Sequence, residues 1–239
     1  MPILEGKRVT KTFGGLTAVH HVDFNIAKDE IVGLIGPNGA GKTTLFNLVS
    51  GALPLSEGDI RYKNERITSL KPNAICKRGI ARTFQLIKLF GNMTVLENVL
   101  VPALFGLSKS IDQLEAKAAS LEVLEFVGLS AARDIPAKEL TLVNQKRLEV
   151  ARGLATKPEL LLLDELMAGL NSTEVAQAME LVTRIRDRGI TVFMIEHVMQ
   201  AIMSVCDRIM VLDHGVKIAE GKPEAITADQ KVIEVYLGE

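Results

Sequence analysis

A glycine-rich stretch of this sequence has the residue types and spacing of a phosphate-binding loop. Residues 36–44 read GPNGAGKTT and fit the pattern G-x-x-x-x-G-K-[ST]. Glycines let backbone N–H groups wrap closely around an anion because they lack a Cβ, and Lys42 adds a positive charge for the β and γ phosphates. The Thr43 hydroxyl can ligate Mg²⁺. The predicted nucleotide-binding residues of this loop are Gly36, Pro37, Asn38, Gly39, Ala40, Gly41, Lys42, Thr43 and Thr44.

The flanking residues have the order that a phosphate-binding loop requires. Residues 30–35 form a short apolar run, which is typical of a strand buried on both faces. Residues 44–49 are predicted to form a helix whose positive end faces the phosphates. Because strand, loop and helix follow one another, a nucleoside triphosphate site is favoured over an ordinary glycine-rich turn.

Two acids follow a second apolar strand, which is predicted over residues 159–163. A phosphate-loop enzyme needs a carboxylate at such a strand end to hold Mg²⁺, and Asp164 is the candidate. Glu165, one residue further on, faces differently and can polarise the attacking water as a general base. The alternative is a solvated acidic loop after a core strand, which the phosphate-binding loop upstream disfavours.

Polar side chains end two further predicted strands. Gln85 ends residues 80–85, and its amide can contact Mg²⁺ or the lytic water. His197 follows residues 190–195, from where its imidazole can reach a γ-phosphate, although a lone histidine at a strand end is usually structural. Since ligands of parallel sheets bind at the carboxyl ends of the strands, we expect both side chains beside the phosphate-binding loop.

The repeated alternation of strands and helices predicts an α/β fold with a mostly parallel sheet. Residues 9–26 alternate polar and apolar residues and are predicted to form antiparallel strands around a turn at Gly14-Gly15. Phe13, just before that turn, is either a half-buried strand residue or a surface on which a nucleobase can stack.

The alternation is interrupted by a helical region over residues 94–137. Thr94 can cap its first helix, with Glu97 completing a capping box. A second helix, ending near Gly128, is predicted to bury an apolar face. That face comprises Ile111, Leu114, Ala118, Leu121, Leu124 and Val127.

Composition narrows the classes of protein to which the chain can belong. Of its 239 residues, 47% are hydrophobic and 24% are charged, as expected for a folded protein of one large domain. A net charge of −1, an aromatic content of 4% and the lack of Trp argue against a nucleic-acid partner. We expect no secretory signal and see no apolar run of about 18 residues, so a membrane role requires a partner.

Taken in order, these motifs resemble the nucleotide-binding subunit of ABC transporters. Residues 36–44 match the family's Walker A loop, and residues 160–165 match Walker B with the catalytic glutamate. Gln85 matches the Q-loop, His197 the switch histidine, and Phe13 the aromatic residue that stacks on adenine. The resemblance implies an ATPase that uses ATP and Mg²⁺, with Thr43, Gln85 and Asp164 organising the metal.

The resemblance also implies a domain organisation. It covers nearly the whole chain and includes a D-loop at residues 168–171. It therefore implies one P-loop NTPase domain of the ABC type over residues 1–239, with an antiparallel β part at the N-terminus. A helical subdomain is inserted at approximately residues 94–156.

The sequence departs from the family at the signature loop. The family reads LSGGQ, whereas residues 140–144 read LTLVN. In the family this loop closes over the γ-phosphate held by the opposite subunit, and Thr141 keeps the hydroxyl that would act there in trans. Val143 replaces the glycine nearest the phosphate and adds a branched Cβ where the backbone approaches the anion. Leu166 stands where the family usually has a proline.

Several phrases resemble the ATP-binding subunits of branched-chain (hydrophobic) amino acid importers; they lie at residues 11–16, 81–85, 93–99, 168–171 and 236–239. The resemblance implies transmembrane permease subunits and a second ATP-binding subunit as direct partners. A periplasmic or extracellular solute-binding protein is an indirect partner. The implied location is peripheral, on the cytoplasmic face of the inner or cell membrane.

Other assignments remain open from the sequence. One is an ABC subunit of weak intrinsic hydrolysis that acts in a heterodimer, which Val143 would favour. Another is a subunit of a different transporter, such as one that exports lipid or lipopolysaccharide. Soluble ABC proteins of translation or DNA repair usually carry two cassettes or long coiled-coil insertions, which this sequence lacks. A small-molecule kinase would not require the acids at 164 and 165 or the histidine at 197.

Overall fold

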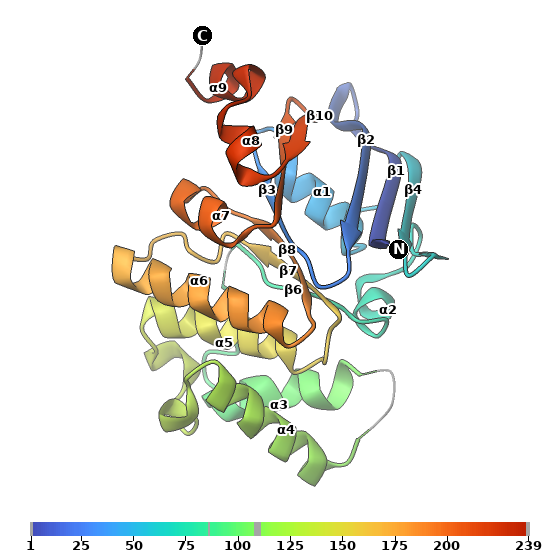
Figure 1. Ribbon diagram of the computed structural model, residues 1–239. Coiled ribbons are helices and arrows are strands. Elements are labelled where there is room, and N and C mark those ends of the chain that lie inside the picture. The colour runs from blue at the N-terminus through green and yellow to red at the C-terminus, as the bar shows by residue number, and fades with distance from the viewer. Residues whose placement is uncertain (1, 86, 108–110, 238–239) are drawn as a thin grey trace.

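The computed structural model describes residues 2–85, 87–107 and 111–237, which form two β-sheets with helices between and outside them (Figure 1). Five strands of the larger sheet are parallel, and β10 joins one edge in the antiparallel direction. The predicted α/β fold with a mostly parallel sheet is therefore confirmed. In spatial order the strands of this sheet are β10 (Val216–Gly221), β9 (Arg208–Asp213), β3 (Ile31–Ile35), β8 (Thr191–Ile195), β7 (Leu160–Asp164) and β6 (Ile80–Arg82).

The smaller sheet is antiparallel and comes from the N-terminal part of the chain, as predicted. Its first two strands are joined through the turn at Gly14-Gly15. In Figure 1 this sheet stands on the right, and α1 (Lys42–Val49) lies between it and the larger sheet. In spatial order its strands are β2 (Leu16–Ala27), β1 (Pro2–Phe13), β4 (Glu57–Tyr62) and β5 (Glu65–Arg66).

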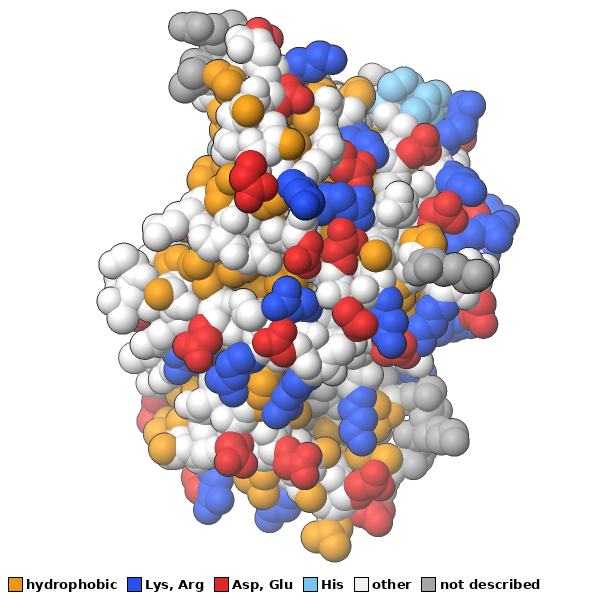
Figure 2. Space-filling view, in the orientation of Figure 1, with side chains coloured by type: hydrophobic (Ala, Val, Ile, Leu, Met, Phe, Trp, Pro, Cys, Tyr) orange, Lys and Arg blue, Asp and Glu red, His pale blue; other side chains and the backbone are white. Residues whose placement is uncertain are grey.

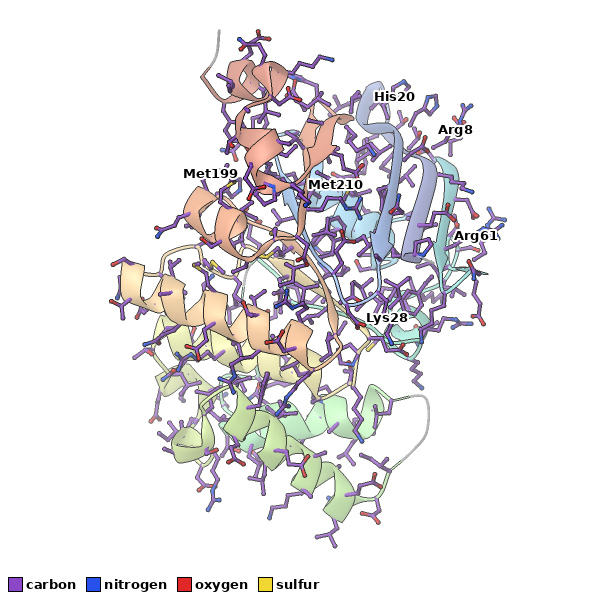
Figure 3. All side chains as sticks on the ribbon, in the orientation of Figure 1. Arg8, His20, Lys28, Arg61, Met199 and Met210 are labelled. Atoms are coloured by element: carbon purple, nitrogen blue, oxygen red, sulfur yellow. The ribbon has the colours of Figure 1, made fainter. Side chains whose placement is uncertain are left out.

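The larger sheet is buried on both faces. Its central strands β3, β8 and β7 are buried along their whole length. Alternate residues face different cores because side chains of a strand alternate in direction: Leu161 and Leu163 contact the helical side, and Leu160 and Leu162 contact the side of α1. In Figure 3 the labelled Met210 of β9 points into this second core. The loops at the strand ends are therefore held by a rigid support.

The remaining helices lie on the other side of the larger sheet or beyond its edges (Figure 1). They are α2 (Pro72–Cys76), α3 (Val95–Phe105), α4 (Gln113–Phe126), α5 (Leu142–Leu154), α6 (Ser172–Asp187), α7 (Met199–Val205), α8 (Pro223–Thr227) and α9 (Gln230–Leu237), with short 3₁₀ turns at Ser130–Ala132 and Ala137–Glu139.

The helices α3 to α5 lie between β6 and β7 in the sequence, although these two strands are hydrogen-bonded neighbours. The predicted capping box at the start of α3 is present, with Glu97 N–H donating to Thr94 Oγ1 and Thr94 N–H donating to Glu97. α5 packs on α3 and also on the sheet, where Gly153 lies against Leu161 and Ala81. The helical region thus shares a core with the sheet, and its status as a separate subdomain remains a prediction.

The structure corrects several details of the predicted elements. The apolar face predicted for α4 is wrong in its first half, because Leu114 is 78% exposed and Ala118 is also exposed. The small residues Ala116 and Ser120 are buried instead, which allows α4 to approach its neighbours closely. β6 ends three residues before Gln85, and α5 begins at residue 142 rather than 145.

No helix within the described ranges is long and apolar enough to cross a membrane. On the face shown in Figure 2, basic and acidic side chains are interspersed. This distribution agrees with the low net charge and gives that face no broad basic footprint of the kind that binds nucleic acid.

Candidate nucleotide-binding site

A cavity of about 230 Å³ lies where the phosphate-binding loop meets the strand ends of the larger sheet. The residues that line it are Ala18, Asn38, Gly39, Ala40, Gly41, Lys42, Thr43, Thr44, Gln85, Glu165 and His197. Segments separated by more than a hundred residues thus meet in one place. The loop and the three polar residues predicted from separate strands line the same cavity.

The phosphate-binding loop adopts a backbone that only glycine fits at two positions. Gly41, the residue before α1, has a φ of 99°, and a Cβ there would lie 2.4 Å from Ala18 O. Gly36 has a φ of 149°, and a Cβ there would lie 2.0 Å from Leu212 O. The loop therefore packs tightly against β2 and β9 while the first N–H groups of α1 are left for a ligand.

Lys42 is 6% exposed, and its ammonium lies inside the loop. Its Nζ donates to Gly36 O at 2.7 Å and to Pro37 O at 2.9 Å. Burial lowers the pKa of Lys42, and the carboxylates of Glu165 and Asp164 oppose that shift. An ammonium has three donors, so one N–H remains for an anion in the cavity.

Asp164 ends β7 and is buried beside an arginine. Arg82 Nη2 donates to Asp164 Oδ2 at 2.8 Å, and both side chains are almost fully buried. Arg82 Nη1 also donates to Asn47 Oδ1 and Ser50 Oγ, so the guanidinium links β6, β7 and α1. Burial raises the pKa of Asp164, and the hydrogen bond and charge of Arg82 oppose it. Arg82 thus holds Asp164 through Oδ2, and the other carboxylate oxygen, Oδ1, makes no hydrogen bond to the described residues.

The carboxylate of Glu165 is bracketed by the two other predicted polar residues. Gln85 Nε2 donates to Glu165 Oε2 at 2.8 Å, and His197 Nε2 lies 2.9 Å from Glu165 Oε1. The three residues follow β6, β7 and β8, which are adjacent strands. This arrangement orients the Glu165 carboxylate at the cavity wall, and His197 contacts that carboxylate directly.

These residues fit a nucleotide with its magnesium ion. Asp164 Oδ1 is buried with no hydrogen-bond partner among the described residues, so an acceptor oxygen is left for a cation. Thr43 lines the cavity, and its hydroxyl offers a second oxygen ligand. Mg²⁺ usually takes one or two protein oxygens and completes its shell with phosphates and water, and this donor set matches that preference.

Five predicted site residues are not among those that line this cavity: Gly36, Pro37 and Asp164, which belong to the adjoining loop and strand end, and Phe13 and Thr141, which lie elsewhere. Phe13 ends β1 and is 45% exposed, with Lys11 Nζ 5.0 Å from its ring centroid, and it does not line the cavity. Thr141 precedes α5, is exposed, and makes no capping hydrogen bond to the helix. Neither position conflicts with a role that requires a bound base or a second subunit, and both roles remain predictions.

Sequence reasoning missed three buried residues that support the site. Arg82 holds Asp164, and Lys146 Nζ donates to Glu165 O at 2.9 Å. Glu196 accepts a hydrogen bond from Met167 N–H at 2.8 Å, and burial raises its pKa to about 7. In the sequence, such residues could have been recognised as charged residues within or next to an apolar strand, or on the apolar side of a predicted helix.

The last helix also reaches the phosphate-binding loop. Partial burial raises the pKa of Tyr236 on α9, and the nearby backbone N–H of Gly36 opposes that shift. Residues 238 and 239, which complete the predicted C-terminal phrase, lie outside the described residues.

Comparison with known proteins places the chain in a family. Residues 19–168 match the ABC transporter family, and residues 216–239 match the family described as branched-chain amino acid ATP-binding cassette transporter. The chain is 40% identical to the high-affinity branched-chain amino acid transport ATP-binding protein BraF of Pseudomonas aeruginosa, covering 100% of this chain and 98% of that protein. It is 34% identical to the lipopolysaccharide export system ATP-binding protein LptB of Haemophilus influenzae, over 100% and 98%.

Solved structures give the same assignment. The ADP conformation of an ATP-binding cassette of an ABC transporter superposes with a TM-score of 0.91 at 33% identity, covering 100% of both chains. A dimeric cassette bound to ADP and Pi superposes with a TM-score of 0.83 at 28% identity, covering 92% of this chain and 98% of that one. The chain therefore belongs to the ABC transporter family and is a nucleotide-binding, ATP-hydrolysing subunit of such a transporter.

Proposed function

We propose that ATP is hydrolysed in the cavity beside Lys42, with Glu165 as the general base. The observation that carries this proposal is the position of the Glu165 carboxylate, which faces the phosphate-binding loop and is held by Gln85 and His197. In this geometry Glu165 can accept a proton from a water molecule that attacks the γ-phosphate. Lys42 and the N–H groups at the start of α1 stabilise the negative charge that develops on the phosphates.

Magnesium is proposed to lie between the phosphates and the residues Thr43, Asp164 and Gln85. The ion would neutralise charge on the β- and γ-phosphates. Asp164 offers its free Oδ1, and Arg82 fixes the carboxylate from the other oxygen. His197 is proposed to contact the γ-phosphate while it continues to orient Glu165. Phe13 is proposed to stack on the adenine.

A second ATP-binding subunit completes the site in this proposal. Thr141 and the first turn of α5 would approach the γ-phosphate held by the partner, because the exposed N-terminus of α5 has unsatisfied N–H groups. Residues 1–239 act as one ABC ATPase domain, and the helical region at 94–156 moves with the signature loop. The dimeric cassette bound to ADP and Pi supports a two-subunit arrangement.

The proposed membrane partner docks at a separate groove of about 480 Å³. This groove lies between α2 and β6 on one side and α3 and α5 on the other. Its wall is mostly apolar and includes Phe84 and Phe90, which are 40% and 44% exposed. A helix of a transmembrane permease that presents apolar side chains fits such a groove. The chain would then lie at the cytoplasmic face of the membrane, held there by the permease.

The proposed cargo is a branched-chain or other hydrophobic amino acid that is imported. The match of residues 216–239 and the 40% identity to BraF support this choice, and a periplasmic or extracellular solute-binding protein would deliver the cargo. The 34% identity to LptB supports a second candidate, lipopolysaccharide export. Uptake of radiolabelled leucine by cells that express this chain with each candidate permease pair distinguishes the two.

The catalytic proposal is tested with Glu165→Gln. The amide cannot accept the proton of the attacking water, so we expect ATP turnover to fall by about 100-fold or more while ATP binding is retained. The measurements are phosphate release and equilibrium binding of a fluorescent ATP analogue. Lys42→Ala serves as a control that should lose binding as well. A Glu165→Gln protein that hydrolyses ATP at the normal rate would remove Glu165 from the mechanism.

A further inference from the structure

The backbone of Glu165 is strained. Its φ is 52°, in the left-handed region that residues with a Cβ rarely adopt. Such a conformation persists only where surrounding contacts fix it. Leu166 leaves the φ and ψ angles at 165 less restricted than a proline at 166 would. The contacts that hold this backbone therefore decide where the Glu165 carboxylate points.

The two main-chain polar groups of Glu165 are each held by a hydrogen bond from another element. Its N–H donates to Ile195 O of β8 at 2.9 Å. Its carbonyl accepts from Lys146 Nζ of α5, also at 2.9 Å. A weaker bond from Ala168 N–H, at 3.3 Å, closes the turn that follows. Lys146 is thus the side chain that fixes the carbonyl side of the strained residue.

Lys146 is a buried side chain with charged partners, not a solvent-exposed surface lysine. It is 7% exposed, and the buried carboxylates of Glu196 and Glu149 lie near its ammonium. Glu196 in turn accepts from Met167 N–H, so both ends of the segment 165–167 are held by buried charged groups. Burying a lysine ammonium without such partners would cost free energy of folding, so its paired position here indicates a specific structural role.

The same helix also holds the segment that contains Gln85. Glu149, one turn after Lys146 on α5, accepts hydrogen bonds from Phe84 N–H at 3.3 Å and Lys88 N–H at 3.5 Å. The residue that donates to the Glu165 carboxylate and the backbone of Glu165 itself are therefore both attached to α5. A shift of α5 would be transmitted to both sides of the carboxylate.

We propose that Lys146 is a positioning residue for Glu165: its hydrogen bond to the main-chain carbonyl holds the strained backbone that aims the carboxylate into the cavity. Through this bond the orientation of Glu165 depends on the position of α5, whose first turn forms the signature loop of the same chain. This inference rests on the proposed role of Glu165 as general base. It assigns to Lys146 no contact with the nucleotide.

The test compares Lys146→Met with Arg147→Met in the full-length chain. Methionine keeps the length and packing of the lysine stem but removes the donor. We expect the kcat for ATP hydrolysis to fall about 10- to 100-fold with KM and ATP affinity changed less than about twofold, because a misplaced base affects only the chemical step. Arg147 lies next on the same helix but donates to Gln177 on α6, so Arg147→Met should leave kcat unchanged.

A double-mutant cycle separates positioning from a general loss of structure. In the Glu165→Gln background, Lys146→Met should cause no further loss of the residual turnover, because the group it positions is already inactive. Lys146→Arg, which keeps a donor, should recover part of the kcat. If Lys146→Met does not fold, Lys146→Leu, which also lacks a donor, takes its place in the cycle.

Two results would overturn the inference. One is an unchanged kcat in the folded Lys146→Met variant while Glu165→Gln is strongly impaired. Glu165 would then act as the base without needing the hydrogen bond from Lys146. The other is an equal loss in both backgrounds, which would assign Lys146 to stability alone. A failure of the proposed function itself is distinguishable, because Glu165→Gln would then hydrolyse ATP normally.

Discussion

Among the described residues, the carboxylate of Asp164 accepts a side-chain hydrogen bond from Arg82 alone. The guanidinium reaches Asp164 from the neighbouring strand and is itself held by Asn47 and Ser50 of the helix that follows the phosphate-binding loop. Removing one partner of a buried ion pair leaves an uncompensated charge, which costs more than the pair contributes. Arg82 therefore couples the stability of the fold to the geometry of the proposed metal ligand.

We expect Arg82→Met to lower the free energy of unfolding by about 3–5 kcal/mol at neutral pH. Burial already raises the pKa of Asp164, and the loss of Arg82 raises it further. An acid whose pKa is higher in the folded state destabilises the fold above that pKa, and the penalty disappears as the pH falls through it. The loss in the free energy of unfolding of Arg82→Met, relative to the parent chain, should therefore be smaller at pH 5 than at pH 8. Urea unfolding at the two pH values measures this difference.

Arg66→Met is the matched control for this prediction. Arg66 also pairs with an aspartate, Asp59, but its side chain is 64% exposed. Exposed ion pairs contribute at most about 1 kcal/mol, so this variant should change stability little. Equal losses for the two variants, or a deficit for Arg82→Met that does not depend on pH, would contradict the proposed pairing.

Among the elements of the fold, α5 connects the proposed signature loop to the catalytic residues. Thr141, which precedes α5, and Leu142, its first residue, are exposed, whereas Lys146 and Glu149 are buried against the segments that carry Glu165 and Gln85. Val143 is the second residue of this helix and is half-buried. Its branched Cβ stands among the N–H groups that would face a phosphate of the partner subunit.

Val143→Gly should raise ATP turnover, because it removes the Cβ that crowds the first turn of α5. The substitution should also lower helix stability by about 0.5–1 kcal/mol. Steady-state phosphate release and thermal unfolding measure the two effects. Val123→Gly, at a half-buried position of α4, should show the stability loss without the gain in turnover. Unchanged or slower hydrolysis in Val143→Gly would mean that the loop has adapted to valine.

The whole molecule carries two proposed functional surfaces, which meet at the segment after β6, where Phe84 lines the groove and Gln85 lines the cavity. The nucleotide cavity lies at the carboxyl end of the parallel strands, and the apolar groove lies between β6, α2, α3 and α5. Arg82, Phe84 and Glu149 line the groove, and the Glu149 carboxylate accepts a hydrogen bond from the N–H of Phe84, the residue before Gln85. A partner in the groove can therefore influence the segment that carries Gln85.

We expect Phe90→Ala to weaken association with the permease subunits while ATP hydrolysis by the isolated chain is retained. The Phe90 ring is 44% exposed in the groove and lies 4.8 Å from the Arg152 guanidinium. Co-purification of the chain with detergent-solubilised permease measures the effect. Phe105→Ala is the control, since Phe105 is more exposed, at 73%, but does not line the groove. If Phe90→Ala and Phe105→Ala co-purify with the permease to the same extent, the permease does not dock in this groove.

Some features of this protein followed from the sequence because their physical basis is local. The phosphate-binding loop requires glycines and a lysine at fixed spacing, and the acids at 164 and 165 come directly after a buried strand. The capping box of α3 was likewise determined by two residues three positions apart. The buried face of α4 was not, because small residues such as Ala116 are buried by the close approach of other helices, which no periodicity of large apolar residues reveals.

Only the tertiary structure decided which charged groups meet. Arg82 and Asp164 are 82 positions apart, and Lys146 and Glu165 are 19 apart, so neither contact follows from a local pattern. Each contact exists because the sheet and α5 bring distant segments together in a buried environment, where an unpaired charge would be costly. The sequence determined what chemistry the site can perform, and the packing of the elements determined how its acids are held.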